Sequence, residues 1–168
     1  MLVGLSGSGK STVGPLLAAR LGRRFVDTDD LIEAEAGATI PEIFAERGEG
    51  AFRAIEETAV ARAVGGEPAV IATGGGAPMG QRNRDLLWQG NLVVWLDANV
   101  PTLARRLERG GPDRPLLRSP GGPAERLQGL LEARRPIYAQ AHLHLRTDTL
   151  SPDAVVEEIA RRIEEEAG

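Results

Sequence analysis

Short runs of consecutive apolar residues alternate along this chain with longer stretches in which apolar residues recur every three or four positions. The consecutive runs predict strands at Leu2–Leu5, Ala69–Thr73 and Leu92–Leu96, and the last two are apolar enough to be buried on both faces. Two further strands are predicted at Arg24–Asp27 and Leu143–Arg146. Because strands alternate with helices, the pattern indicates an α/β protein whose parallel sheet is covered on both sides.

The helical spacing also predicts where helices begin and end. Asp30 with Glu33 forms a capping-box pattern that predicts the start of the second helix, and Gly37 predicts its end. The predicted helices run from Ser11 to about Leu21, around Leu31–Ala36, from Ile40 to about Val64 with a break at Gly48–Gly50, and over Pro152–Glu166.

One segment, Glu108–Pro123, follows neither pattern. It is dense in glycine, proline and arginine, which predicts a loop rather than a helix or strand. A loop of this length in a compact domain is usually functional or disordered. Arginines between glycines favour a mobile lid that closes over phosphates, and the alternative is a solvated linker.

Composition narrows the class of protein. With 168 residues, of which 42% are hydrophobic, the chain is expected to form one domain, residues 1–168, around a sizeable core. A formal net charge of −4 without a basic stripe disfavours nucleic acid as a partner. The sequence has no cysteine and no apolar run of membrane-spanning length, so we expect a soluble, cytoplasmic protein without disulfides or a membrane partner. A monomer is expected because no apolar patch is evident.

The first motif that carries chemistry is Gly4-Leu5-Ser6-Gly7-Ser8-Gly9-Lys10-Ser11, which matches the phosphate-binding pattern G-x-x-x-x-G-K-[ST]. A predicted strand precedes it and a predicted helix follows, as the motif requires. Its glycines allow backbone N–H groups to face phosphate oxygens, and the helix adds its positive dipole end. Lys10 is expected to reach the terminal phosphates of ATP or GTP, and the Ser11 hydroxyl to bind Mg²⁺.

Polar residues follow two more predicted strands at their carboxyl ends, where parallel sheets bind ligands. Asp27 and Asp29 can serve two tasks there, one supporting Mg²⁺ and the other accepting a proton from an attacking hydroxyl. The alternative is that they only cap a helix, a role for which Asp30 has the better spacing. The triplet Gly74-Gly75-Gly76 permits close approach of a ligand to the backbone, or forms only a tight turn.

Two arginines stand in segments too apolar to be wholly exposed. Arg53 and Arg134 can each hold a carboxylate through both ends of the guanidinium group, and Glu56 can orient Arg53 from one helical turn away. Taken singly, each arginine is as well explained by a surface ion pair.

Together these motifs resemble the shikimate kinase family over nearly the whole chain. The residues that carry the resemblance are Gly4-Leu5-Ser6-Gly7-Ser8-Gly9-Lys10-Ser11-Thr12, Asp27-Thr28-Asp29, Ile43-Phe44, Gly48-Glu49, Phe52-Arg53 with Glu56, Gly74-Gly75-Gly76, Arg114-Pro115-Leu116-Leu117 and Arg134-x-Pro136-x-Tyr138. The first motif is common to many kinases, whereas the combination in this order is specific.

The resemblance implies a three-layer αβα P-loop kinase fold like that of nucleoside monophosphate kinases, with sheet order 2-3-1-4-5. It implies a substrate-binding region at about 28–57, a lid at about 108–123, and transfer of the ATP γ-phosphoryl group to the 3-hydroxyl of shikimate. That reaction is a step of aromatic amino-acid biosynthesis through chorismate.

The resemblance also implies roles for single residues. Catalysis would rest on Lys10, Asp29 and Arg114. Mg²⁺ would be held by Ser11 and Asp27. ATP would be bound by Gly7, Ser8, Gly9, Lys10, Ser11, Thr12 and Arg114. Shikimate would be bound by Asp29, Arg53, Gly74, Gly75, Gly76 and Arg134.

The chain departs from the family at two places. Few residues precede the first strand, and the stretch 148–152 lacks the arginine that some members place near adenine, so Arg109 or backbone groups would take that role. The main alternative is a kinase of another hydroxy acid such as gluconate. A nucleoside monophosphate kinase, a GTP-dependent switch and a non-catalytic nucleotide-binding module are less favoured, since their motifs are missing or the catalytic residues are all present.

Overall fold

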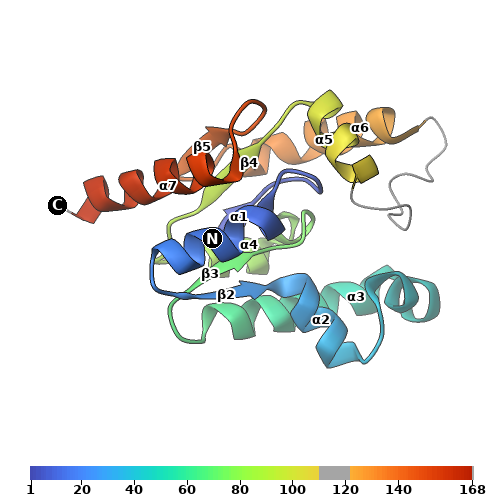
Figure 1. Ribbon diagram of the computed structural model, residues 1–168. Coiled ribbons are helices and arrows are strands. Elements are labelled where there is room, and N and C mark those ends of the chain that lie inside the picture. The colour runs from blue at the N-terminus through green and yellow to red at the C-terminus, as the bar shows by residue number, and fades with distance from the viewer. Residues whose placement is uncertain (110–121, 168) are drawn as a thin grey trace.

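The computed structural model describes residues 1–109 and 122–167 of the chain. Its centre is a parallel sheet with the strand order β2-β3-β1-β4-β5, the order that the resemblance implies (Figure 1). The strands are β1 (Leu2–Val3), β2 (Arg24–Asp27), β3 (Ala69–Ala72), β4 (Val94–Asp97) and β5 (Leu143–Arg146).

Helices connect the strands and cover both faces of the sheet (Figure 1). They are α1 (Lys10–Arg20), α2 (Thr28–Ala36), α3 (Ile40–Val64), the short 3₁₀ helix η1 (Ala77–Met79), α4 (Gln81–Trp88), α5 (Val100–Arg109), α6 (Gly122–Tyr138) and α7 (Pro152–Ala167).

The alternation of side chains along β4 separates two hydrophobic layers. Val94 and Leu96 belong to the cluster formed with α1 and α7, which includes Leu17 and Ile159. Trp95 points to the opposite face, where it joins a cluster that α5 and α6 complete. Because successive side chains of a strand point to opposite faces, one buried strand supports both layers. The expected three-layer αβα arrangement is confirmed.

A smaller core lies beyond the edge of the sheet, between α2 and α3. Ile32, Ile43 and Phe52 are buried there. The backbone of α3 is interrupted at Gly48, whose φ of 78° and ψ of 172° are not helical. A φ in this range favours glycine, so the predicted break is confirmed at that residue.

The sequence misplaced one helix start. The helix expected to begin after Asp30 begins at Thr28, directly behind β2, and its N-cap is Asp27, whose side chain accepts from the backbone N–H of Asp29 at 3.0 Å. The carboxylate of Glu33 instead accepts from the N–H of Ile40 at 2.9 Å. No loop separates β2 from α2, so the first carboxylate in the sequence takes the capping position.

Three helices and η1 were not expected at all, and the boundaries of other elements shift. Helix α5 continues to Arg109 and α6 begins at Gly122, so both ends of the predicted loop 108–123 are helical. The remainder, 110–121, lies outside the described residues. Strand β1 is shorter than the run Leu2–Leu5 because the chain turns into the phosphate-binding loop after Val3.

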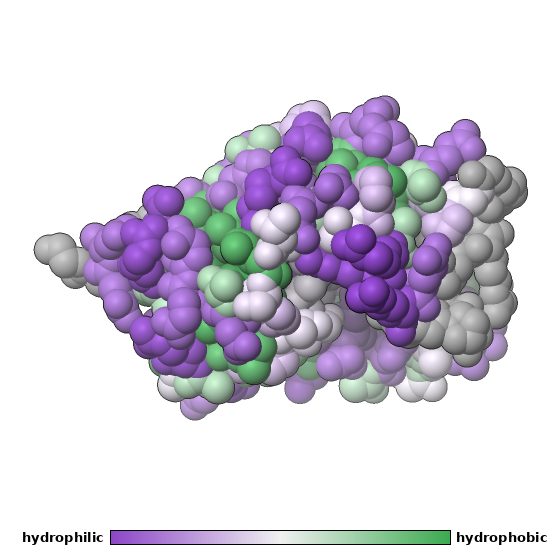
Figure 2. Space-filling model, turned by 45° about the horizontal axis from the view of Figure 1, so that its top comes forward, coloured by the Kyte–Doolittle hydropathy of each residue, from purple (hydrophilic) through white to green (hydrophobic). Residues whose placement is uncertain are grey.

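The surface carries many charged side chains. In Figure 2 the end formed by α7 is largely purple, and hydrophobic residues show only in small areas. The most exposed large hydrophobic residues, Leu16, Phe44 and Leu150, lie on α1, on α3 and after β5. Among the described residues, none of the helices is both long and apolar enough to cross a membrane.

Candidate active site

The phosphate-binding motif forms the loop between β1 and α1. Gly7 and Gly9 have φ angles of 84° and 104°, which ordinary residues rarely adopt, and α1 begins at Lys10 immediately after them. The N-terminus of α1 therefore opens onto the loop, and its dipole favours an anion there. This is the strand–loop–helix context that the motif predicts.

Lys10 is almost completely buried, although it directly follows the loop. Only 9% of the residue is exposed, and its ammonium group donates to the carbonyl oxygens of Gly4 at 2.8 Å and Leu5 at 3.0 Å. It also lies 3.5 Å from the hydroxyl of Ser8. In this structure the carbonyl oxygens of the loop therefore hold the charge of Lys10.

Ser11 and Asp27 lie close enough to share a cation. The Ser11 hydroxyl donates to Oδ2 of Asp27 at 3.2 Å, while Oδ1 of Asp27 caps α2. Both are oxygen ligands of the kind that Mg²⁺ prefers. Among the described residues no cluster of three or more His, Cys, Asp or Glu side chains could hold a metal. The pair of Ser11 and Asp27 suits Mg²⁺ because this ion usually takes only one or two protein ligands and keeps water and phosphate oxygens as the others.

Asp29 occupies a partly buried position next to this pair. Burial is the main cause that raises its pKa from 3.8 to about 6, and the neighbouring carboxylate of Asp27 adds to the increase. The positive charge of Lys10 opposes the shift. A carboxylate with such a pKa is ionised at neutral pH and is more basic than an exposed one, which suits a group that accepts a proton.

The glycine triplet forms a turn after β3, which we call the glycine turn (residues 74–76). A Cβ atom on Gly74 would lie 2.8 Å from Oδ1 of Asp29. A Cβ on Gly75 would lie 2.9 Å from an Arg134 nitrogen, and one on Gly76 would lie 3.0 Å from an Arg53 nitrogen. Three charged groups from separate helices thus approach one stretch of bare backbone, and only glycine leaves room for them.

Arg53 lies between two carboxylates. Arg53 donates to the buried carboxylate of Glu56 at 2.8 Å and to the exposed carboxylate of Glu49 at 3.3 Å. Glu56 therefore orients Arg53, as its helical spacing predicts. Burial raises the pKa of Glu56, but the guanidinium groups of Arg53 and Arg134 oppose this effect. The contact with the exposed Glu49 is a surface ion pair of the kind that the sequence offers as the alternative, whereas Glu56 is buried.

A cavity of about 990 Å³ is lined by the phosphate-binding loop and by part of the glycine turn, whereas Gly76 and the two arginines are not among its lining residues. It runs along the phosphate-binding loop past Asp27 and Asp29 to Gly74 and Gly75. In the other direction it reaches Arg109, Thr147, Leu150 and Pro152. Part of the stretch expected near adenine therefore lines the cavity without an arginine of its own, and Arg109 lines the same cavity.

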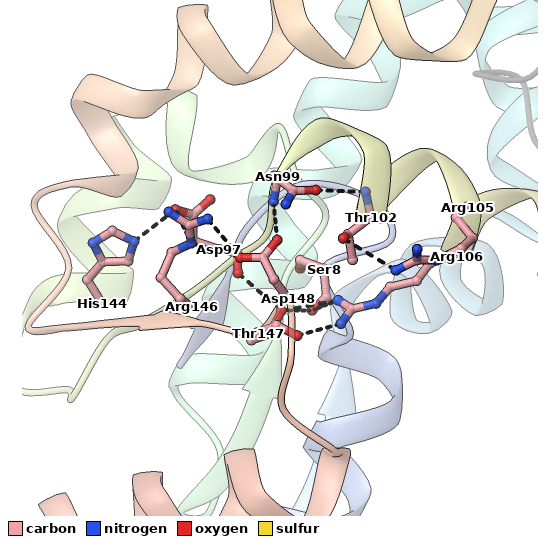
Figure 3. A network of polar contacts seen from close by, with 10 residues as sticks. All are labelled: Ser8, Asp97, Asn99, Thr102, Arg105, Arg106, His144, Arg146, Thr147 and Asp148. Carbon is pink, nitrogen blue, oxygen red and sulfur yellow. Dashed lines mark hydrogen bonds and ion pairs between the residues drawn. The ribbon is translucent and has the colours of Figure 1, made fainter.

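Arg106 was not predicted as a site residue, but it ties the phosphate-binding loop to the end of β5 (Figure 3). Its guanidinium group donates to the backbone oxygen of Thr147 at 2.6 Å and to its hydroxyl at 3.1 Å. It also reaches the carbonyls of Gly7 and Ser8, both at 3.4 Å. These partners lie far from Arg106 in sequence. The only sequence signal for its direction is the helical spacing of Leu103 and Leu107, which marks the buried face of α5 beside it.

A second group of contacts fixes the loop after β5 (Figure 3). Asp148 accepts from the backbone N–H of Asn99 at 2.7 Å and pairs with Arg146 at 2.8 Å. Asn99 in turn accepts from the N–H of Thr102 at 2.9 Å, which caps α5. The start of α5 and the end of β5 are therefore held together beside the cavity.

Comparison with known proteins identifies the family. The family described as shikimate kinase matches residues 6–164, which is nearly the whole chain. This chain belongs to the shikimate kinase family. The shikimate kinase of Symbiobacterium thermophilum is 52% identical over 167 residues, which are 98% of this chain and 95% of the relative. The shikimate kinase of Persephonella marina is 43% identical over 96% of both chains.

Solved structures of shikimate kinases have the same fold. Shikimate kinase from Acinetobacter baumannii in complex with shikimate superposes with a TM-score of 0.92 at 38% identity, over 98% of this chain and 92% of that one. The enzyme from Aquifex aeolicus gives a TM-score of 0.84 at 32% identity, over 99% of this chain and 96% of that one. Of the residues predicted for such a kinase site, Arg114 lies outside the described residues, and the others surround the phosphate-binding loop and the glycine turn.

Proposed function

We propose that this chain transfers the γ-phosphoryl group of ATP to the 3-hydroxyl of shikimate, giving shikimate 3-phosphate and ADP. The observation that carries the proposal is the glycine turn, where one carboxylate and two guanidinium groups converge beside a phosphate-binding loop. Membership of the shikimate kinase family supports shikimate as the acceptor and ATP as the donor. The reaction belongs to the pathway that leads through chorismate to aromatic amino acids.

Asp29 is the proposed base and the group that orients the acceptor hydroxyl. Its carboxylate faces the glycine turn, and the pKa of about 6 keeps it ionised at neutral pH. A hydroxyl that donates to this carboxylate is directed toward the phosphate-binding loop. As the oxygen bonds to phosphorus, its proton passes to Asp29, so no free alkoxide has to form.

Arg53 and Arg134 are the proposed partners of the shikimate carboxylate. They come from α3 and α6 and both approach the glycine turn. Glu56 and Glu49 each accept from a different nitrogen of Arg53, which leaves three of the five N–H donors of the guanidinium group for an acceptor. This arrangement binds an anion at a distance from the transferring group and fixes the orientation of the ring.

Lys10 and Arg114 are the proposed sources of positive charge at the transferring phosphoryl group. Lys10 leaves the carbonyls of Gly4 and Leu5 to reach the phosphates. Mg²⁺ would be held by Ser11 and Asp27, and when bound it supplies charge to the phosphate oxygens. Gly7, Ser8, Gly9 and Thr12 complete the proposed ATP site.

We further propose that residues 1–168 act as one kinase domain and as a monomer in the cytoplasm, without nucleic-acid or membrane partners. The separation of the exposed hydrophobic residues supports a monomer. Light scattering after size-exclusion chromatography tests this, and a mass near 17.9 kDa is expected.

An ATP-consumption assay with a panel of acceptors tests the proposed reaction. Shikimate should stimulate ADP release, whereas gluconate, nucleoside monophosphates and the absence of acceptor should give only a background rate. Mass spectrometry should detect shikimate 3-phosphate. Stimulation by gluconate and not by shikimate would overturn the proposal, and equal ADP release without any acceptor would indicate an ATPase.

A further inference from the structure

The glycine turn is held by hydroxyl groups from two other elements. On one side, the Thr28 hydroxyl accepts from the backbone N–H of Gly74 at 3.2 Å. Thr28 is fully buried and is the first residue of α2. Asp29 follows it in the chain, so this hydrogen bond connects the turn to the residue beside the proposed base.

On the other side, the Tyr138 hydroxyl donates to the carbonyl oxygen of Gly75 at 2.6 Å. Tyr138 is the last residue of α6 and is fully buried. Arg134 lies one helical turn earlier, on the same face, and its guanidinium group interacts with the phenol oxygen. Burial raises the pKa of Tyr138, so the phenol stays protonated at neutral pH and remains a donor.

The position of the turn affects both binding sites. Gly74 and Gly75 make the close approaches to Asp29 and Arg134, and a Cβ on Gly75 would also lie 3.3 Å from the carbonyl oxygen of Gly4 in the phosphate-binding loop. A displacement of a few tenths of an ångström would therefore change the separation of the proposed base and the proposed carboxylate partner. The bare backbone of the turn borders both side chains where a Cβ would not fit, so a shift of the turn changes the space that is left to each of them.

We infer that Thr28 and Tyr138 are positioning residues, whose buried hydroxyls fix the glycine turn so that Asp29 and Arg134 meet one acceptor molecule in register. Neither side chain touches the transferring group. Their role is to set the distance between Asp29, the proposed base, and Arg134, the proposed partner of the acceptor carboxylate. The inference rests on the proposed function, because the acceptor is taken to be a hydroxylated carboxylic acid such as shikimate.

The test uses the full-length protein with Thr28→Val and Tyr138→Phe, each of which removes one hydroxyl and nearly preserves shape. Shikimate affinity by calorimetry and shikimate KM should each weaken about tenfold, the size of one hydrogen bond's net contribution. The KM for ATP should stay within twofold. In the double variant the loss should be less than the product of the single losses, because both hydroxyls hold the same turn.

Thr73→Val is the matched control. Thr73 directly follows β3, is 1% exposed and borders the cavity, and within the described part of the chain its hydroxyl has no hydrogen-bond partner. The same substitution at the same depth should leave shikimate affinity unchanged and slightly raise Tm. Thr28→Ser, which keeps the hydroxyl, should retain most of the shikimate affinity and covers the case in which Thr28→Val does not fold.

The possible results separate this inference from the proposed function. Normal shikimate affinity in folded Thr28→Val and Tyr138→Phe overturns the inference while an active wild type upholds the proposed reaction. A parallel loss of ATP and shikimate affinity that follows Tm also overturns it, since that is the effect of a general structural role. A wild type that neither binds nor phosphorylates shikimate overturns the proposed function and, with it, this inference.

Discussion

Burial raises the pKa of Asp29, which suits the proposed role of this residue as a base but does not stabilise the fold. Its pKa of about 6, against 3.8 in an exposed peptide, means that ionisation is harder in the folded state than in the unfolded chain. The ionised carboxylate therefore lowers the free energy of unfolding at neutral pH. It does not do so in acid, where the carboxyl group is protonated in both states. The proposed base is therefore a residue at which chemistry and folding have opposite demands.

Asp29→Asn should separate the two effects. The kcat with shikimate should fall at least about a hundredfold, because the proton acceptor is lost. At pH 7.5 the free energy of unfolding should rise by about 2 kcal/mol, and the gain should fade as pH drops from 6 to 4, the interval between the two pKa values. Chemical denaturation across this pH range measures the second effect.

In the wild type, kcat/KM should decrease below pH 6 as Asp29 takes up a proton. A flat pH–rate profile between pH 5 and pH 7, or a variant that is less stable than wild type at pH 7.5, would contradict this assignment of the pKa.

Lys10 gives a second prediction at this scale. Lys10→Ala should reduce kcat by about 10² to 10³ or more, as expected when a charge that stabilises the transferring group is lost. It should also lower the free energy of unfolding by about 1 kcal/mol, because the carbonyls of Gly4 and Leu5 lose a buried donor. Steady-state kinetics and urea unfolding measure the two effects. Unchanged stability would show that the loop carbonyls find water instead.

At the scale of elements, the break in α3 shapes the acceptor side of the site. Phe44 and Phe52 are eight residues apart, which in a straight helix separates them by about 12 Å along the axis. Their ring centroids lie 4.4 Å apart because the chain bends at Gly48. Arg53 follows directly, and its guanidinium lies 5.1 Å from the centroid of the Phe52 ring. The bend therefore places the arginine.

Gly48→Ala should cost about 1 kcal/mol or more of unfolding free energy, since alanine is strained at a φ of 78°. Relief of the strain by straightening α3 would move Arg53, so shikimate affinity should fall more than ATP affinity. Gly50→Ala is the control, because Gly50 has no positive φ and a Cβ there would meet nothing within 4 Å. It should be neutral or stabilising. Equal destabilisation by both would argue against the bend.

The elements also show where prediction from sequence succeeds. Strands β2 and β5 have the bounds that the sequence predicts, and the break in α3 falls at Gly48, one of the two glycines expected to cause it. Helix α6 was missed because it begins at Gly122 and contains Pro136, both of which argue against a helix until tertiary packing overrides them. The start of α2 was misplaced because two acidic residues compete for the cap, and the sequence does not show that β2 joins α2 without a loop.

The candidate site shows the same division. The phosphate-binding motif and the glycine triplet could be read from the sequence because they are contiguous. The orientation of Arg53 by Glu56 also follows from helical spacing. Contacts such as that of Arg106 with Thr147 join residues 41 positions apart, and nothing local encodes them.

On the scale of the whole molecule, Arg106 links α5, the phosphate-binding loop and the end of β5 on the half of the sheet opposite the acceptor. Arg106→Met keeps part of the apolar stem but removes four hydrogen bonds to Gly7, Ser8 and Thr147. The KM for ATP should rise about tenfold or more, and shikimate affinity without nucleotide should change less than twofold. Binding measured separately for each ligand tests this division, and equal loss of both would contradict it.

The two carboxylate oxygens of Asp27 make different contacts. Oδ1 caps the start of α2, and Oδ2 accepts from the Ser11 hydroxyl. Asp27 therefore serves both the start of α2 and the proposed Mg²⁺ site. A substitution that suits one of these two roles also affects the other. An attempt to retune the metal preference by exchanging this residue would disturb the entry to α2 and, through it, the setting of Asp29. A variant designed to change the proposed metal site therefore first needs a new N-cap for α2.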